Sequence, residues 1–249
     1  MTKIAIIDFN PDQNPDRRQY VRRISSLIPA GIDIEGIFFR EEVDFSGFDA
    51  LILSGSKLSA TDYQLMVQSG SVTGNDYLSV HRTAERLSQY DGPIFGICFG
   101  AQLGAYVMGG RLGKLQSTEA GYLNHYLTDD GETDTVFGHL PKIFWGAHMH
   151  TDFVDELPSE PGLESRILAL RGGHIHVYSV KMPNGSVRYG VQPHPEMSNP
   201  HDATFLVREN ESWLKHAIGE EDFRRALIVP PNAEYSLAQT ITRFAETLR

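Results

Sequence analysis

The sequence predicts an α/β fold in which a mostly parallel central sheet is flanked by helices. Short apolar runs, typical of buried parallel strands, alternate with stretches whose apolar residues recur every three or four positions. Strands that alternate with helices need crossover connections, which produce a parallel sheet covered on both faces. Of the 249 residues, 41% are hydrophobic and 22% are charged, which is enough apolar surface for a full core.

Strands and helices alternate through the first half of the chain. The runs KIAIIDF at residues 3–9 and ALILS at residues 50–54 are short, apolar and β-rich, as buried strands are. The second run leads into Gly55-Ser56, which is a turn signal. We expect strands at residues 3–9, 32–39, 50–54 and 93–98, helices at residues 15–27, 76–89 and 100–108, and a loop at residues 69–76.

The second half changes to short strands followed by helices. An Asn-Gly pair within residues 182–186 is a hairpin signal. We expect strands at residues 122–128, 166–170, 174–182 and 188–192, and helices at residues 203–217, 220–227 and 237–248. No linker-like stretch interrupts the chain, so we expect one domain over residues 1–249 with a helical C-terminal extension over about residues 200–249.

The composition excludes several classes of function. The 22 basic and 32 acidic residues give a net charge of −10, whereas nucleic acids and anionic membranes attract clustered Lys and Arg. No apolar run approaches the roughly 20 residues of a membrane-spanning helix. The N-terminal apolar run is too short for a signal peptide, and a single cysteine forbids an intrachain disulfide. We therefore expect a cytoplasmic protein that binds neither nucleic acid nor membrane.

The most informative segment is PIFGICFGAQ at residues 93–102. An expected buried strand ends there at Cys98, with Gly96 and Gly100 two positions away on either side. This is the nucleophile-elbow pattern, in which a sharp strand-to-helix turn leaves no room for flanking side chains. The elbow also places the thiol at the N-terminus of a helix, where the helix dipole favours the thiolate. The pattern favours a nucleophilic over a structural Cys98.

A second motif, GVQPHPE at residues 190–196, follows an expected strand and offers a base for the thiol. Histidine is the usual base for such a nucleophile because its pKa lies near neutrality. Glu196 lies two residues beyond His194, and such residues point the same way on an extended segment. We expect His194 to act as the base and Glu196 to orient its ring.

Together, the segments GICFGAQ and GVQPHPE resemble the motifs of the class I (triad) glutamine amidotransferases, and the likeness runs from about residue 1 to 200. The resemblance implies a flavodoxin-like fold with a nucleophile elbow. It also implies a catalytic triad of Cys98, His194 and Glu196. In this family the cysteine attacks the side-chain amide of glutamine and forms a γ-glutamyl thioester.

Weaker matches to the same family imply further site residues. The oxyanion hole would be formed by backbone N–H groups near Gly55 and Ser56 and by that of Phe99. The glutamine pocket would include four matched residues: Gln102, Glu119, Gly121 and His150.

Three features depart from the family pattern. Lys57 stands where many relatives have Pro in the oxyanion loop, and Pro193 stands where many have Phe. The tail after about Asn199 is longer than the usual closing helix and carries no motif. The tail has three candidate roles: it would close the site, bind a partner or recognise a substrate.

The resemblance implies a glutamine amidotransferase or glutaminase that needs neither a cofactor nor a metal. It would bind L-glutamine or another γ-glutamyl compound. The sequence contains no phosphate-binding loop of a synthase, so a separate synthase subunit would receive the ammonia, unless the enzyme only hydrolyses its substrate. One alternative is a γ-glutamyl hydrolase acting on γ-glutamyl amines or peptides. Another is a catalytically silent, amidotransferase-like binding or regulatory subunit.

Some conspicuous residues are interpreted without a catalytic role. Two His-x-His pairs, His148 with His150 and His174 with His176, lack the spaced Cys or helical HExxH motif of common metal sites, so no metal is expected. His176 alternates with apolar residues in an expected strand and is placed on a solvated face. Trp213 is interpreted as a core or interface aromatic residue.

Overall fold

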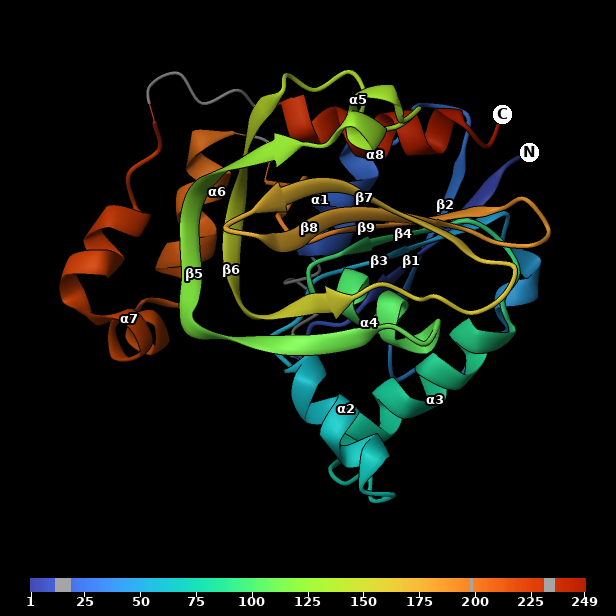
Figure 1. Cartoon of the computed structure of the whole chain (residues 1–249). Coiled ribbons are helices and arrows are strands. Elements are labelled where there is room, and N and C mark those ends of the chain that lie inside the picture. The colour runs from blue at the N-terminus through green and yellow to red at the C-terminus, as the bar shows by residue number, and fades with distance from the viewer. Residues whose placement is uncertain (12–18, 198, 231–235) are drawn as a thin grey trace.

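The fold is built around one nine-stranded sheet (Figure 1). A computed structural model describes residues 1–11, 19–197, 199–230 and 236–249. The strands are β1 (Lys3–Asp8), β2 (Asp33–Phe38), β3 (Ala50–Leu53), β4 (Ile94–Ile97), β5 (Arg111–Leu127), β6 (Ile143–Glu156), β7 (Glu164–Arg171), β8 (His174–Lys181) and β9 (Val187–Val191). Their order in the sheet is β2-β1-β3-β4-β9-β8-β6-β5-β7, and β8 also pairs with β7.

Five neighbouring strands, β2, β1, β3, β4 and β9, pair in parallel and form the centre of the fold. The alternation of strands and helices predicts this part of the sheet, and the α/β class is confirmed. Ile97 at the end of β4 pairs with Val191 at the end of β9. The segments that follow these two strands, which carry the Cys98 and His194 motifs, therefore leave the sheet at neighbouring points.

Helices cover both faces of the parallel strands (Figure 1). The helices are α1 (Gln19–Ser26), α2 (Ala60–Gln68), α3 (Asn75–Gln89), α4 (Phe99–Val107), α5 (Asp129–Thr133), α6 (Pro200–Arg208), α7 (Glu211–Ala226) and α8 (Gln239–Glu246). Successive side chains of β1 point to opposite faces: Ile4 belongs to a core with α1 and α8, and Ala5 to a core with α2, α3 and α4. Residues 15–18 of the first expected helix lie outside the described residues.

A long antiparallel arm made by β5 and β6 is the largest feature that the sequence did not predict. Only residues 122–128 of β5 were expected as a strand, and β6 was not expected at all. The pairing of the two strands shifts register between Lys114 and Glu119. Strand β6 carries buried polar side chains, including His148, His150 and Asp152, so its sequence does not show the apolar pattern of a strand.

Helix α2 was missed for a related reason. Its buried face includes the polar residues Thr61 and Gln64 beside Tyr63, so apolar residues do not mark one face. The helix begins after Ser59, whose side chain accepts a hydrogen bond from the Asp62 N–H at 3.1 Å.

The C-terminal helices pack on the arm and on the sheet. Helix α8 buries Phe244 against Phe95 of β4, with ring centroids 5.3 Å apart. The expected helix at residues 203–217 is divided between α6 and α7, which meet at Asn210. Within α7, Gly219 has φ 82° and marks the break that the sequence predicts between residues 217 and 220. Among the described residues, no helix combines the length and the apolar character needed to cross a bilayer.

Candidate active site

Cys98 occupies a strained turn between β4 and α4. Its φ of 50° and ψ of −109° make it the one non-glycine residue with a positive φ in the described part of the chain. A Cβ on Gly96 would lie 2.7 Å from the Ala101 nitrogen, and a Cβ on Gly100 would lie 2.4 Å from the Leu53 carbonyl oxygen. Both glycines are therefore needed for the close approach of strand and helix, as the elbow pattern predicts.

His194 and Glu196 form a buried pair beside this turn. The Nδ1 of His194 lies 2.7 Å from the Glu196 carboxylate, and the two residues are 3% and 1% exposed. The backbone N–H of His194 donates to the Ala147 carbonyl of β6 at 2.9 Å, which anchors the motif to the arm. A Cβ on Gly55 would lie 2.8 Å from His194 and 3.6 Å from Cys98, so the loop after β3 contacts both residues.

The surroundings of His194 favour its protonated form. Burial alone would lower the pKa of this ring, but the charges of Glu196 and Cys98 and hydrogen bonds to both raise the pKa to about 10. Because Nδ1 is occupied by Glu196, Nε2 is the nitrogen left to exchange a proton with the sulfur. The three residues thus have the composition and contacts of a nucleophile, a base and an orienting carboxylate.

A pocket of about 550 Å³ opens beside Cys98. Its lining consists of Ser56, Lys57, Leu58, Ser59, Cys98, Phe99, Gln102, Lys114, Met149, His150, Thr151, Asp152, Asn210 and Trp213. Lys57 and Lys114 provide positive charge, and Met149 and Trp213 provide apolar surface. The pocket therefore suits a small anionic or zwitterionic ligand.

The expected oxyanion residues lie around Cys98. Ser56 and Phe99 line the pocket, and Gly55 packs against the sulfur-bearing residue. The Ser56 hydroxyl donates to the Phe9 carbonyl at 2.8 Å and accepts from the Leu58 N–H at 3.0 Å. These bonds hold the loop without the proline that many relatives carry.

The four expected glutamine-binding residues divide into two groups. Gln102 and His150 line the pocket, and the buried Gln102 amide donates to the Asp152 carbonyl at 2.7 Å and to Gln192 at 3.0 Å. Glu119 and Gly121 are not part of its lining. Gly121 has φ 102°, and a Cβ there would lie 2.8 Å from the Ala226 Cα of α7.

Several pocket residues carried no signal in the sequence that marks them as site residues. Trp213 is 48% exposed and stands in the pocket wall with Asn210, so the C-terminal extension forms part of the site. Lys114 comes from the unexpected first part of β5. Which of many polar and aromatic residues reach a pocket depends on how distant elements pack, so no local pattern could have identified them.

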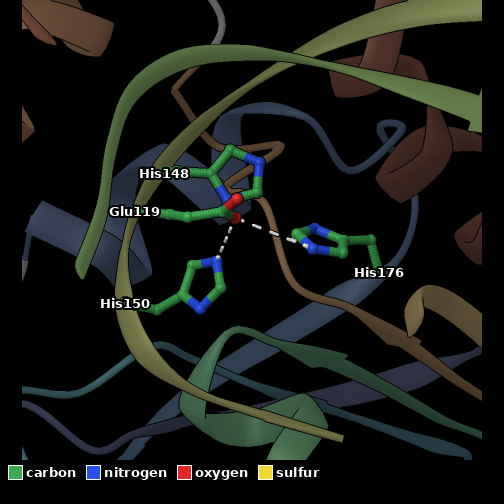
Figure 2. Close-up of side chains that lie close together, drawn as sticks. All are labelled: Glu119, His148, His150 and His176. Carbon is green, nitrogen blue, oxygen red and sulfur yellow. Dashed lines mark ion pairs between the residues drawn. The ribbon is translucent and has the colours of Figure 1, made fainter. Parts of the chain in front are cut away.

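A cluster of buried histidines corrects one expectation. His176 is 1% exposed and does not lie on a solvated face, because β8 is covered on the side that carries it. Its Nε2 lies 3.7 Å from the Glu119 carboxylate, and the Nε2 of His150 lies 3.2 Å from it, as Figure 2 shows together with His148. His174 is separate and packs on Phe153, with ring centroids 4.4 Å apart.

The pKa values in this cluster follow from burial and mutual contact. Burial lowers the pKa of His176 to about 2 and that of His125 to about 3, and it places that of His148 well below its usual range. Burial alone would raise the pKa of Glu119, but His150, His176 and Arg171 lower it to about 2. Glu119 is therefore a carboxylate at neutral pH.

Similarity to known proteins covers most of the chain. The model of the family described as glutamine amidotransferase class-I matches residues 40–211. A subunit of the glutamine-hydrolysing GMP synthase of Thermococcus kodakarensis is 32% identical over 126 residues, or 50% of this chain and 61% of that protein. The glutamine-hydrolysing GMP synthase of Bacillus licheniformis is 27% identical over 176 residues, or 66% of this chain and 31% of that protein. The chain thus spans less than two thirds of the length of these curated relatives.

Solved structures agree in fold. A glutamine amidotransferase from Thermotoga maritima superposes with a TM-score of 0.69 at 15% identity, covering 99% of this chain and 97% of that one. A glutamine amidotransferase from Methylobacillus flagellatus gives a TM-score of 0.61 at 14% identity, covering 99% and 91%. At such identities the likeness establishes the fold alone. Because the family model spans more than half of the chain, this protein belongs to the class-I glutamine amidotransferase family.

Proposed function

We propose that this protein hydrolyses the side-chain amide of L-glutamine through Cys98, His194 and Glu196 and delivers the ammonia to an acceptor or synthase partner. The observation that carries the proposal is the buried His194–Glu196 pair, 2.7 Å apart, beside a cysteine held in an elbow that opens into a pocket. A structural cysteine would need neither the strained turn nor the paired imidazole.

The first half of the reaction forms the thioester. The Cys98 sulfur attacks the amide carbon, and the carbonyl oxygen takes the negative charge of a tetrahedral intermediate. The backbone N–H of Phe99 and those of the Gly55-Ser56 loop would stabilise this oxyanion, each donor being worth about 3 kcal/mol of barrier. His194 then gives its proton to the amide nitrogen, the carbon–nitrogen bond breaks, and ammonia leaves.

The second half returns the enzyme to its starting state. His194, now neutral, takes a proton from a water molecule whose oxygen attacks the γ-glutamyl thioester. The carbon–sulfur bond breaks, glutamate is released, and the Cys98 sulfur and His194 recover their initial protonation. Glu196 keeps the ring of His194 in position throughout.

The charges in the pocket support an amino-acid substrate. Lys57 and Lys114 both line it and would attract the α-carboxylate of glutamine. Asp152 also lines the pocket, where its carboxylate accepts from Ser59 at 2.7 Å and from Thr61 at 2.8 Å and lies 3.8 Å from the Lys114 ammonium group. Recognition of the α-carboxylate by the lysines would orient the amide toward Cys98.

A partner protein would use the ammonia. Relatives whose names describe one subunit of a glutamine-hydrolysing GMP synthase support this, because such a name makes them one component of a larger synthase. We propose that this chain likewise supplies ammonia to a separate acceptor-binding subunit. Co-purification and assays with candidate synthases would identify the acceptor.

A second candidate is hydrolysis of γ-glutamyl amines or peptides. The pocket volume of about 550 Å³ lies in the range of sites that bind drug-sized ligands, and apolar Leu58, Met149 and Trp213 stand in its wall. Such a wall would accept an organic group on the amide nitrogen. The same triad would then release an amine in place of ammonia.

The test measures glutamate release from L-glutamine and from γ-glutamyl amines by the full chain, with and without candidate synthase subunits. We expect Cys98→Ala and His194→Asn to abolish turnover, while His81→Asn, a half-exposed histidine on α3, retains it. Faster turnover of γ-glutamyl amines would favour the second candidate. No turnover, combined with no labelling of Cys98 by a glutamine-analogue electrophile under any of these conditions, would overturn both and support a catalytically silent subunit.

A further inference from the structure

Four side chains outside the proposed catalytic triad converge between β5, β6 and β8. They are Glu119, His148, His150 and His176, and one ligating atom from each lies within 4.8 Å of all the others (Figure 2). The three histidines are buried. Register explains part of the convergence, because Glu119 of β5 pairs with His150 of β6, and His148 lies two residues from His150 on the same face.

The contact between His150 and Glu119 needs a cation. The Nδ1 of His150 lies 2.9 Å from the Asp152 carbonyl oxygen, which can only accept, so Nδ1 carries the hydrogen. The Nε2 of the neutral ring then presents a lone pair to the Glu119 Oε2 at 3.2 Å. Two acceptors this close repel each other unless a metal ion or a second proton lies between them.

Further polar atoms of the cluster are without hydrogen-bond partners among the described residues. They include both nitrogens of His176 and the Nδ1 of His148, together with the Glu119 Oε2. The Nε2 of His148 is engaged with His125 at 2.8 Å, so Nδ1 is the atom it can offer. Buried polar atoms are nearly always satisfied, and several unsatisfied atoms facing one another indicate a ligand.

We propose that Glu119, His148, His150 and His176 bind a divalent transition-metal ion of the Zn²⁺ class. Three imidazoles and one carboxylate form a donor set that Zn²⁺ accepts. Tetrahedral ligation at about 2.0–2.1 Å places ligand atoms roughly 3.4 Å apart. The distances of 3.2 Å and 3.7 Å from the Glu119 Oε2 to the Nε2 atoms of His150 and His176 match this spacing. All four ligand atoms lie within 4.8 Å of one another, so the most distant pair must move closer together when the ion binds.

The surroundings orient the ligands as metal sites require. The Nδ1–H of His150 donates a hydrogen bond to the Asp152 carbonyl, which fixes the tautomer that leaves Nε2 free to ligate. Arg171 donates to the Glu119 Oε1 at 3.1 Å and thereby leaves Oε2 facing the imidazoles. Both contacts exist before any ion binds, so His150 and Glu119 are already oriented for ligation.

The ion would join the β5–β6 arm to β8 and stiffen one wall of the pocket. Three strands supply the ligands, and His150 also lines the pocket that contains Cys98. The site does not depend on the proposed glutamine hydrolysis, because its residues are separate from the triad. Metal binding is therefore tested by readouts other than activity.

The experiment uses tag-free full-length protein with Cys98→Ala, so that the active-site thiol cannot bind the metal. After chelator treatment, Zn²⁺ titration by calorimetry should give one site per chain and raise the thermal unfolding midpoint. Co²⁺ should give the intense visible absorption of a tetrahedral complex. His176→Gln and His148→Gln should each weaken binding by about 100-fold or more, a larger effect than the loss of an outer-shell partner.

The matched control is His174→Gln, a histidine on the same strand that packs on Phe153 outside the cluster. It should bind Zn²⁺ as the parent does. Absence of stoichiometric binding by the parent protein would overturn the proposal and indicate that a proton bridges His150 and Glu119. Equal loss in the His174 and His176 variants, or unchanged binding when His148 and His176 are both replaced, would overturn it as well.

Discussion

Gly100 shows how much of the site depends on the absence of a single methyl group. A Cβ there would lie 2.4 Å from the backbone oxygen of Leu53, which cannot move without disturbing β3. The residue lets α4 begin directly over the sheet, and so it sets the position of Cys98. Because a Cβ at position 100 would come so close to the Leu53 backbone, a substitution of Gly100 is a sensitive test of the elbow.

We expect Gly100→Ala to lower the free energy of unfolding by about 1–3 kcal/mol, the usual effect of overpacking. Chemical denaturation measures this loss. Alkylation of Cys98 by iodoacetamide should slow, since the displaced helix alters the turn. Gly47→Ala is the control, because no heavy atom lies within 4 Å of a Cβ there. Equal stability of the two variants would contradict the tight contact.

The charge on His194 leads to a prediction of pH dependence. The pKa of about 10 lies above the usual value of 6.5, so the imidazolium persists from acid pH up to about pH 10. Replacing Glu196 by Gln removes the main charge that offsets burial, so the pKa of His194 should fall. With less imidazolium beside it, Cys98 should react more slowly with an electrophile at neutral pH.

The expected result for Glu196→Gln is slower alkylation of Cys98 at pH 7, by about tenfold. The rate profile should shift toward alkaline pH. Glu246→Gln, on the exposed side of α8, should leave the profile unchanged. A wild-type profile in the Glu196 variant would argue against the orienting role.

Among the elements, the β5–β6 arm connects the pocket, the histidine cluster and α7. Gly121 lies where β5 meets α7, at a φ of 102°, and a side chain there would collide with the Ala226 backbone. The contact keeps the helix that carries Trp213 close to the pocket. Glu119 and Gly121, matched to the family's glutamine pocket, are not among the residues that line the pocket.

Gly121→Ala should therefore displace α7 as well as strain the backbone. We expect a loss of about 2–4 kcal/mol in unfolding free energy, combining strain and overpacking, and faster hydrogen exchange in α7. Gly173→Ala separates the two effects, because Gly173 has φ 85° but open space around a Cβ. Exchange in α7 that is unchanged in the Gly121 variant would contradict the packing role.

The elements that the sequence predicts are those with a simple pattern. Strands β3 and β4 are apolar throughout, β1 is apolar between Lys3 and Asp8, and α3 carries buried residues at helical spacing, so both types are visible locally. The sequence does not predict strand β6 and helix α2, because their buried faces include polar side chains. Those side chains are satisfied or clustered by residues far away in the sequence, which local patterns do not encode.

In the whole molecule, the C-terminal extension and the sheet build the pocket together. Trp213 lies in the wall at 48% exposure, although α7 follows His194 and Glu196 in sequence. The extension therefore contributes to the site itself, which supports substrate recognition among the roles considered for it.

Trp213→Ala should raise KM for the substrate by about tenfold, since losing a half-buried aromatic contact is on the order of 1.5 kcal/mol. Alkylation of Cys98 by a small electrophile should not change, because the triad is untouched. Ile228→Ala removes an exposed apolar side chain outside the pocket and is expected to be neutral. An unchanged KM would show that Trp213 does not contact the substrate.

Short segments of the chain are enough to predict the features that they encode locally. The elbow requires glycines at positions 96 and 100, the His194-Pro195-Glu196 segment places two side chains on one side, and the family follows from such motifs. Only the tertiary structure determines three other features. These are the burial of His176, the position of Trp213 in the pocket wall and the closeness of Glu119 to three imidazoles. These relations depend on strand register and helix packing across large sequence separations, where many side chains compete for each contact and no local period records the outcome.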